Sequence, residues 1–335
     1  MRRVLVTGAS GFLGAHVAAR LAAVGMSVLA QGRDAGRCAA LEAAGHAVVR
    51  IDLSQPFDAA VDAAFGEPDA IVHCAALSAP FGRPADFETA NVTATRNLVD
   101  FARRQGVRRF VQISSPSVCF AFRDQLGVSE DMALPEPVNA YARTKRQGEG
   151  IVLAMSGIGP VVLRPRGIYG AGDRALLPRL LGAARQRPLP LFRDGQARID
   201  LTHVDDVVDA VFAALAAGSA ADGQIFNVSG GEVLPVRRIA EDACARSGLT
   251  ARWRKMPLWP AMLAAGVMEA VALRLPGQPE PPVTRYGLGL FAYAQSLDIA
   301  KAGRILGWAP RVSFEEGLDR TFGKTENQGA IGRAA

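Results

Sequence analysis

Two groups of residues have types and spacings suited to holding a nucleotide and moving a proton. The segment 7–14, Thr-Gly-Ala-Ser-Gly-Phe-Leu-Gly, follows the apolar run 4–6. Such a strand-to-helix turn brings backbone N–H groups and a helix N-terminus close to a pyrophosphate. Tyr141 and Lys145 are four residues apart, so they share a helix face, where an ammonium lowers a tyrosine pKa that is otherwise about 10. Together the two groups predict a nucleotide-dependent enzyme.

The elements that must position these groups alternate between strand and helix up to about residue 165. We expect strands at 3–6, 27–31, 47–51, 70–73, 109–114 and 161–164. We expect helices between them at 15–24, 35–44, 59–65, 86–105 and 140–155. This order predicts an α/β protein with a doubly wound parallel (Rossmann) sheet and right-handed crossovers.

The pattern changes after residue 165, where loops rich in Gly, Pro and Arg separate the helices. Helices are expected at 176–186, 204–216, 236–247 and 260–273. We therefore expect a dinucleotide-binding domain at 1–165 and a smaller C-terminal α+β substrate-binding portion at 166–324. A polar, aperiodic tail follows at 325–335. The run 224–228 is a candidate to return to the edge of the main sheet.

Composition excludes several classes of protein. The 335 residues, 49% of them hydrophobic, suffice for a large core. The four cysteines stand far apart without CxxC or His/Cys clusters, which predicts no disulfide framework, no metal site and a reduced, cytoplasmic setting. The net charge of +6 comes from scattered arginines, which favours small anionic ligands over nucleic acid. The first strand starts too early to leave room for a targeting segment.

The segment 256–275 is the most apolar stretch of the chain. Glu269 and Arg274 interrupt it, and prolines bracket it, so it is too short and broken to span a membrane. We expect a packed helix, with a lipophilic lid or a membrane-surface contact as the alternatives.

Further motifs extend the pattern along the chain. They are Asp52-Leu53, His73-Cys74-Ala75-Ala76, Asn91, Ser114-Ser115, Arg164-Pro165-Arg166-Gly167-Ile168-Tyr169-Gly170 and His203-Val204-Asp205-Asp206. With these and the two groups above, the chain resembles the extended short-chain dehydrogenase/reductase family over nearly its whole length. The set as a whole is specific, whereas the glycine motif alone is weak.

The resemblance implies a catalytic set of Ser115, Tyr141 and Lys145. In that family the hydroxyl at the end of the fifth strand bonds the reacting oxygen, the tyrosine transfers a proton, and the lysine holds the cofactor ribose and tunes the tyrosine. The resemblance favours Ser115 over Ser114 and Ser117 because the polar residue of that family stands three residues before a Val, which here is Val118. Hydride transfer leaves or consumes negative charge on an oxygen, so a donor of matched acidity is what the chemistry needs.

The resemblance also implies positions that surround the pyrophosphate, adenine, ribose and nicotinamide of the cofactor. They are Gly8, Ser10, Gly11, Phe12, Leu13, Gly14, Asp52, Leu53, Ala75, Ala76, Tyr141, Lys145, Pro165 and Ile168.

The end of the second strand predicts which dinucleotide is used. An NAD site would place Asp or Glu eighteen residues after Gly14, where this chain has Gly32. Arg33 follows, with Arg37 one turn later, and arginine pairs with phosphate through a bidentate fork. NADP(H) is therefore favoured, with Arg33 on the 2′-phosphate, and Asp34 keeps NAD(H) as the alternative.

One segment favours a sugar-nucleotide substrate. The run 196–200, Gln-Ala-Arg-Ile-Asp, resembles the segment with which nucleotide-sugar epimerases and dehydratases hold a diphosphate. A dehydratase would show an acid pair where this chain has Pro116 and Ser117, and Cys119-Phe120 replaces the Tyr-Gly common there.

The apolar composition favours a lipophilic substrate instead. The 3β-hydroxysteroid dehydrogenase-like branch resembles this chain better, particularly over 163–174 and 281–293. A 2-alkyl-3-ketoalkanoate reductase of that branch would meet a carboxylate with Arg166, Arg174 or Arg198 and hold alkyl tails in a lid. The large apolar residues that form either this pocket or plain core are Phe120, Phe122, Leu126, Trp259, Met262, Met268, Phe291 and Tyr293.

We therefore predict an NADP(H)-dependent reductase or dehydrogenase acting on the C=O/CH–OH group of a lipophilic substrate. A nucleotide-sugar epimerase is the first alternative. A non-catalytic protein that senses NADP(H) is the second, and the intact Ser115, Tyr141 and Lys145 set counts against it. The family resemblance implies a homodimer through the helices at 86–105 and 140–155, whose apolar faces allow it.

Overall fold

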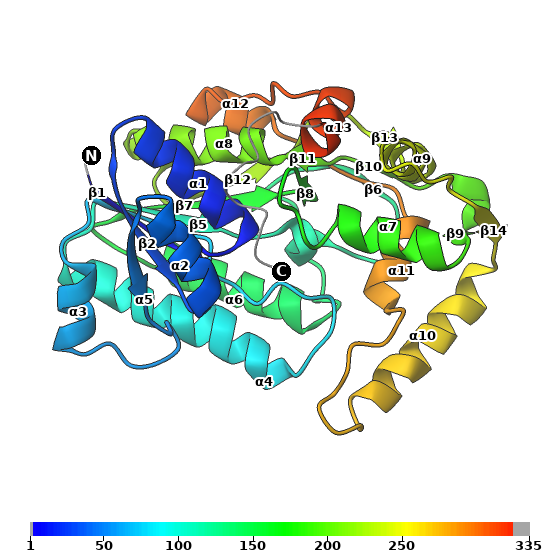
Figure 1. The fold of residues 1–335 in the computed structure, drawn as a ribbon, viewed down its shortest axis with the longest axis horizontal. Coiled ribbons are helices and arrows are strands. Elements are labelled where there is room, and N and C mark those ends of the chain that lie inside the picture. Colours follow the sequence, from blue (N-terminus) through cyan, green and yellow to red (C-terminus); the bar gives the residue numbers. More distant parts are fainter. Residues whose placement is uncertain (1–2, 324–335) are drawn as a thin grey trace.

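The computed structural model describes residues 3–323. Its main sheet has seven parallel strands and lies between helices (Figure 1). The strand order is β12-β7-β5-β4-β1-β2-β3, and every neighbouring pair is parallel. The predicted doubly wound sheet is confirmed, and 224–228 returns to its edge as β12. The strands are β1 Arg3–Thr7, β2 Ser27–Gly32, β3 Ala47–Arg50, β4 Ala70–His73, β5 Arg109–Ile113, β7 Gly159–Pro165 and β12 Gln224–Val228.

Helices cover both faces of the sheet because successive strand residues point to opposite sides. Val4 and Val6 belong to one apolar cluster, whereas Leu5 belongs to the other. The first face is covered by α1 Phe12–Ala23, α2 Ala35–Ala43, α8 Val204–Ala216 and α12 Ala300–Leu306. The second is covered by α3 Ala59–Phe65, α5 Ala94–Arg104 and α6 Ala140–Leu153.

The strand order reverses between β1 and β4. The chain runs outward from β1 to β3 on one side, and β4 begins the other side. In a doubly wound sheet this reversal opens a crevice at the carboxyl ends of the strands, where ligands bind. The glycine segment after β1 and the loops after β4 and β5 therefore meet at one edge.

The helix predicted at 86–105 is present as an unbroken helical segment over 84–104, but a π-helical turn interrupts its regular α-helical geometry. It contains α4 Pro84–Phe87, a π-helical turn at Glu88–Thr93 and α5. Inside the π turn, the Asn91 side chain accepts a hydrogen bond from the Leu77 N–H at 2.8 Å and donates to the Leu77 carbonyl at 3.2 Å. Such turns are often found at functional sites.

The remaining elements form small sheets and helices beside the main sheet. Their strands pair as β13-β10-β15-β6, β11-β8 and β14-β9. The strands are β6 Gln125–Val128, β8 Ile168–Tyr169, β9 Leu189–Leu191, β10 Arg198–Ile199, β11 Thr202–His203, β13 Leu234–Pro235, β14 Trp253–Lys255 and β15 Gln295–Leu297. The helices are α7 Leu177–Gln186, α9 Val236–Arg246, α10 Leu258–Ala272, α11 Arg285–Ala292 and α13 Phe314–Phe322, with 3₁₀ turns at Pro116–Cys119, Arg193–Gly195 and Ser219–Ala221.

Elements from each side of residue 165 join a sheet that is formed mainly by residues of the other side. Strand β6 joins a small sheet formed otherwise by later residues, while β12, α8 and α12 belong to the main sheet and its cover. We keep the division at 165 as a proposal about which part binds cofactor and which binds substrate. The tail predicted at 325–335 lies outside the described residues.

Candidate active site

The turn between β1 and α1 has no room for side chains at two glycines. Gly8 has φ +65°, and a Cβ there would lie 2.6 Å from the Ala75 backbone nitrogen. A Cβ on Gly14 would overlap the Gly8 carbonyl oxygen. Helix α1 begins after Gly11 with no side chain capping its N-terminus. Its first N–H groups are thus available to an anion, and the turn fits a pyrophosphate.

Gln31, which the sequence analysis did not select, supports this turn. Its buried side chain accepts a hydrogen bond from the Gly8 N–H at 3.0 Å and donates to the Ile51 carbonyl at 2.5 Å. One amide thereby ties the glycine turn to the ends of β2 and β3. A polar residue inside an otherwise apolar strand was the available signal.

The end of β2 closely approaches the glycine turn. A Cβ on Gly32 would lie 2.8 Å from the hydroxyl of Ser10 and from the thiol of Cys38. The missing side chain therefore lets the turn pack against the strand end, where the adenosine half of a dinucleotide binds in such folds.

Charged groups beside this strand end are already partly paired. The Arg33 guanidinium lies 3.7 Å from the Asp52 carboxylate, and both side chains are well exposed. Burial raises the pKa of Asp52, but hydrogen bonds from Ser54 and the charge of Arg33 outweigh it, so that pKa lies below its ordinary value. Asp34 caps α2 by accepting a hydrogen bond from the Arg37 N–H at 2.8 Å.

Helix α6 carries Tyr141 and Lys145 one turn apart. Asn139 caps this helix. Lys145 is 5% exposed, and its ammonium donates to the Ile113 carbonyl at 2.5 Å, at the end of β5. Burial lowers the pKa of Lys145 to about 8, against the opposing charge of Glu149. Tyr141 is partly exposed, with its ring 6.4 Å from that of Phe87.

The serines after β5 have different partners. The Ser114 hydroxyl donates to Glu149 at 2.5 Å, and Glu149 also receives two hydrogen bonds from Arg164, at 2.8 and 2.7 Å, in a buried cluster. Ser115 is partly exposed, and its oxygen accepts from the Ser117 N–H at 3.2 Å. Accepting that bond leaves the Ser115 O–H free to donate.

His73 lies at the end of β4, beneath these groups. Its ring pairs with the hydroxyls of Thr7 at 2.7 Å and Thr95 at 3.0 Å. Burial, with a smaller effect of the Lys145 charge, lowers the pKa of His73 to about 3. The ring is therefore neutral at ordinary pH and joins β1, β4 and α5.

Arg166 stands out among the three predicted substrate arginines because it is buried. It donates to the Gln295 side chain at 2.6 Å and lies 3.3 Å from Asp200. Arg166 also lines a small cavity that includes Pro116 and Phe120. Arg174, on the loop after β8, and Arg198, on β10, are exposed.

Tyr286 on α11 was missed by the sequence analysis. Its ring centre lies 5.0 Å from that of Phe120. Burial raises the pKa of Tyr286 to about 12; the Arg166 charge opposes the shift and Tyr141 adds to it. Phe120 lines the small cavity together with Arg166, so the contact with Phe120 places Tyr286 beside that cavity.

Several other predicted positions lie along the same edge. Leu53 is buried below the end of β3, Ala75 is partly buried and Ala76 is exposed. Pro165 ends β7, and Ile168 pairs with Thr202 in the β8–β11 sheet.

The predicted apolar residues separate into groups. Phe120 and Phe122 stack edge to face at 5.3 Å, and the ring of Tyr293 lies 6.5 Å from Phe122. Leu126 and Trp259 are exposed, so they line no interior pocket. Met262, Met268 and Phe291 join the cluster between α10 and α11.

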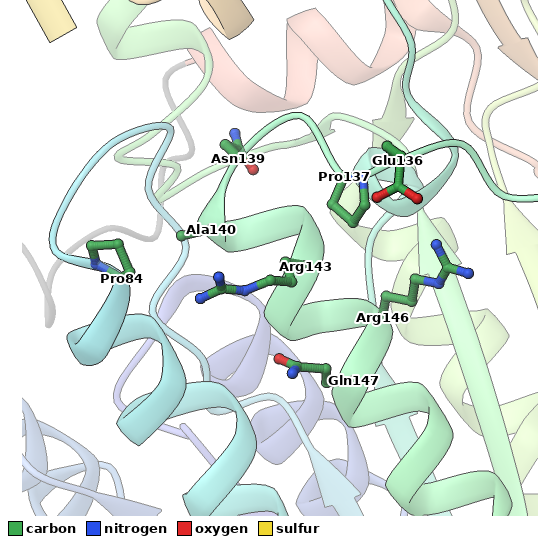
Figure 2. Close-up of a pocket in the computed structure, with 8 residues that line it drawn as sticks. All are labelled: Pro84, Glu136, Pro137, Asn139, Ala140, Arg143, Arg146 and Gln147. Atoms are coloured by element: carbon green, nitrogen blue, oxygen red, sulfur yellow. The ribbon is translucent and has the colours of Figure 1, made fainter. Parts of the chain in front are cut away.

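A cavity of about 630 Å³ lies on the outer face of α6, away from the proposed chemistry (Figure 2). Figure 2 shows Arg143 extending toward Pro84 of α4, with Arg146 and Glu136 on the other side. None of Ser115, Tyr141 and Lys145 lines it. The full lining is Pro84, Glu136, Pro137, Asn139, Ala140, Arg143, Arg146 and Gln147.

Within residues 3–323, no helix is long and apolar enough to cross a membrane. In the same range, no group of three or more His, Cys, Asp or Glu side chains is placed to hold a metal ion.

Comparison with known proteins decides the family. Residues 4–229 match the profile of the "NAD dependent epimerase/dehydratase family". The chain belongs to this family. It is an extended short-chain dehydrogenase/reductase, so the predictions of the family and of a dinucleotide-dependent enzyme are confirmed.

Relatives of this family member carry reductase and dehydrogenase names. It is 34% identical to a 2-alkyl-3-oxoalkanoate reductase of Stenotrophomonas maltophilia over 95% of this chain and 98% of that one. It is 31% identical to the decarboxylating sterol-4-alpha-carboxylate 3-dehydrogenase of Saccharomyces cerevisiae, over 81% and 80%. The predicted branch is thereby confirmed. The UDP-glucuronic acid 4-epimerase of Bacillus cereus in complex with NAD shares the fold, with a TM-score of 0.74, 24% identity and coverage of 96% and 97%.

Proposed function

We propose that this protein interconverts a ketone and a secondary alcohol on a lipophilic substrate, with a 2-alkyl-3-keto acid as the first choice and a 3β-hydroxysteroid-like compound as the second. The observation that carries the proposal is the contact of the buried Lys145 ammonium with the Ile113 carbonyl, because it holds α6, with Tyr141 one turn earlier, against the end of β5, which Ser115 follows. The names of the relatives support the same reaction class.

The chain's own residues supply the proton. Reduction adds a hydride to the carbonyl carbon and a proton to the carbonyl oxygen. The Ser115 hydroxyl donates a hydrogen bond to that oxygen, and Tyr141 gives up its phenolic proton to it. The Lys145 ammonium, held at the Ile113 carbonyl, stabilises the resulting phenolate. The alcohol oxidation follows the same steps in reverse.

A nicotinamide dinucleotide fits the edge described above. When bound, it supplies or accepts the hydride. Gly8, Gly11 and Gly14 would hold its pyrophosphate at the α1 N-terminus, and Lys145 its ribose. We propose NADP(H) rather than NAD(H), because Arg33 is exposed beside Gly32 and no carboxylate stands at that position.

Arg166 suits the carboxylate of a keto acid. Its Nη2 and Nε face Gln295 and Asp200, whereas its Nη1 has no partner among the described residues. Phe120, Phe122 and Tyr286 form an adjacent aromatic wall for an alkyl chain.

One residue of the segment 196–200, which favoured a sugar nucleotide, makes its contacts inside the protein. Asp200, in the segment read as diphosphate-binding, is buried and accepts hydrogen bonds from Ser229 at 2.6 Å and from the Leu297 N–H at 2.9 Å. Asp200 therefore stabilises the site from the protein interior.

Oxidation of NADPH by the purified protein tests the proposal. We expect turnover with 3-keto acids or 3-oxosteroids and none with UDP-sugars. Each buried methylene contributes about 0.8 kcal/mol, so four added carbons should raise kcat/KM by about two orders of magnitude until the pocket fills. Activity confined to UDP-sugars would replace the proposal by an epimerase. Dinucleotide binding without turnover of any of these compounds would favour the sensor.

The assembly and location of the protein are also proposals. We propose a homodimer through α5 and α6, and the outer face of α6 carries the cavity in Figure 2. We propose a cytoplasmic location because the four cysteines are free.

A further inference from the structure

Helix α10 exposes a continuous apolar stripe. Trp259, Leu263, Val267 and Val271 follow one another at four-residue intervals, and their exposed fractions are 84%, 73%, 56% and 50%. Residues four apart lie on one helix face, so these side chains form a single stripe. Single exposed apolar residues are ordinary, but a stripe along a whole helix marks an interaction surface. Figure 1 shows α10 at the periphery of the molecule, away from the main sheet.

The charged groups at the two ends of α10 that lack an ion-pair partner among the described residues are positive, whereas Lys255 pairs with Asp194. The single acidic residue of α10, Glu269, is mostly buried and pairs with Arg285 at 2.8 Å. Arg254 precedes the helix and Arg274 follows it, and both are exposed without a carboxylate partner among the described residues. An aromatic and aliphatic stripe flanked by arginines suits the boundary between lipid headgroups and acyl chains.

The opposite face of α10 leads to the proposed substrate site. Ala265 is buried there and belongs to an apolar cluster with Leu288 and Ala292 of α11. Helix α11 also carries Tyr286, whose ring packs on Phe120. A molecule that leaves a lipid layer at α10 would thus have to pass only this helix to reach the aromatic wall of Phe120, Phe122 and Tyr286.

We propose that α10 docks this protein on the surface of a membrane containing anionic lipids. The helix has 15 residues, so it is about 22 Å long and lies on a bilayer whose hydrocarbon core is about 30 Å thick. A second copy of the chain fits the stripe less well. Across a two-fold axis, antiparallel helices would place Arg254 near the partner's Arg274, and parallel helices would pair like residues, so arginine meets arginine in both. Any benefit of docking for catalysis rests on the proposed function, whereas binding to the membrane does not depend on it.

Sedimentation of the full chain with vesicles tests the inference. The probes are phosphatidylcholine vesicles and vesicles in which phosphatidylglycerol replaces about a third of that lipid. We expect the wild type to sediment with the anionic vesicles. Trp259→Ser combined with Leu263→Ser should lower the partition coefficient at least about tenfold. Arg254→Gln and Arg274→Gln should each lower it about fivefold on the anionic vesicles alone.

A matched control uses Val24→Ser, which removes an exposed apolar side chain after α1, far from α10 in the sequence. It should bind vesicles like the wild type. A wild type that stays in solution with both vesicles would overturn the inference, as would equal sedimentation of the Trp259/Leu263 variant. A dimer that this variant converts to monomers, without vesicle binding by the wild type, would assign the stripe to a second copy. Turnover of soluble short-chain ketones without vesicle binding would reject docking alone, whereas vesicle binding without any turnover would reject the proposed function alone.

Discussion

Burial acts on Lys145 in a way that suits a proton-transfer site. The folded protein lowers the pKa of this ammonium to about 8, while the neighbouring Glu149 charge opposes the shift. The side chain therefore keeps its positive charge at neutral pH, where that charge stabilises a Tyr141 phenolate, and loses it as the pH rises through about 8. At this scale the structure also distinguishes Ser115 from Ser114, because Ser114 already donates to Glu149.

Tyr141→Phe tests the proton donor. Removing one hydroxyl should lower kcat by about 10²-fold or more, because the carbonyl oxygen loses its acid, while NADPH binding measured by fluorescence titration survives. Tyr293→Phe is the matched control, since that ring stacks beneath Arg193. Turnover of the Tyr141 variant close to that of the wild type would rule out the assignment.

Arg33→Ala tests the choice of dinucleotide. Loss of a charge-assisted contact to a 2′-phosphate should weaken NADPH binding by about 1–3 kcal/mol and leave NADH binding little changed. Arg37→Ala, one turn along the same segment, shows whether any nearby cation suffices. Equal weakening of both dinucleotides by Arg33→Ala, or equal use of both by the wild type, would contradict NADP(H) selectivity.

At the scale of elements, the site depends on loops that pack closely against one another. The β1–α1 turn approaches the loop after β4 so tightly that Gly8 meets the Ala75 backbone. The π turn at Glu88–Thr93 lets Asn91 hold the Leu77 backbone in the same region. These loops have few alternative positions, which preorganises the edge where the dinucleotide would bind.

Gly14→Ala tests the close packing of the first turn. The added methyl group would overlap the Gly8 carbonyl, so we expect lower thermal stability and loss of dinucleotide binding by at least about tenfold. Gly182→Ala on α7 is the control, because that position has open space and a helix favours alanine over glycine by about 1 kcal/mol. If both variants bind NADPH like the wild type, the turn does not require Gly14.

At the scale of the whole molecule, buried polar groups join strands that are far apart in the sequence. His73 joins β1, β4 and α5 through Thr7 and Thr95. Arg164 of β7 forms a buried bidentate pair with Glu149 of α6. Such groups are costly to bury and favourable only when all partners are present, so they help to make folding cooperative.

The neutral His73 predicts a specific loss of stability in acid. The pKa of His73 is about 3 in the folded chain against an ordinary value of 6.5, so the unfolded chain binds more protons between these values. Its contribution to stability is complete above pH 6.5 and falls as the pH drops toward 3, by up to about 1.4 kcal/mol per pH unit. Urea unfolding at several pH values measures this slope. An NMR titration that shows the His73 ring becoming charged near its ordinary pKa would disprove the explanation.

The sequence by itself determined the features that depend on neighbouring residues. Helix α8 and strand β4 have the predicted bounds, 204–216 and 70–73. The glycine turn and the spacing of Tyr141 from Lys145 were also evident, because local periodicity and turn chemistry act over a few residues. The family and its reaction class followed from motifs of this local kind.

Only the tertiary structure decided which of several similar residues face the site. Arg166 is buried because Gln295, 129 residues away, and Asp200 receive its guanidinium. The π turn within the helix at 86–105 contains Asn91, which pairs with the Leu77 backbone, and a helical pattern does not report such a contact. Helix α10 is apolar on all sides, so periodicity could not tell which face is exposed. In each case the deciding contact joins residues distant in the sequence, and folding alone brings them together.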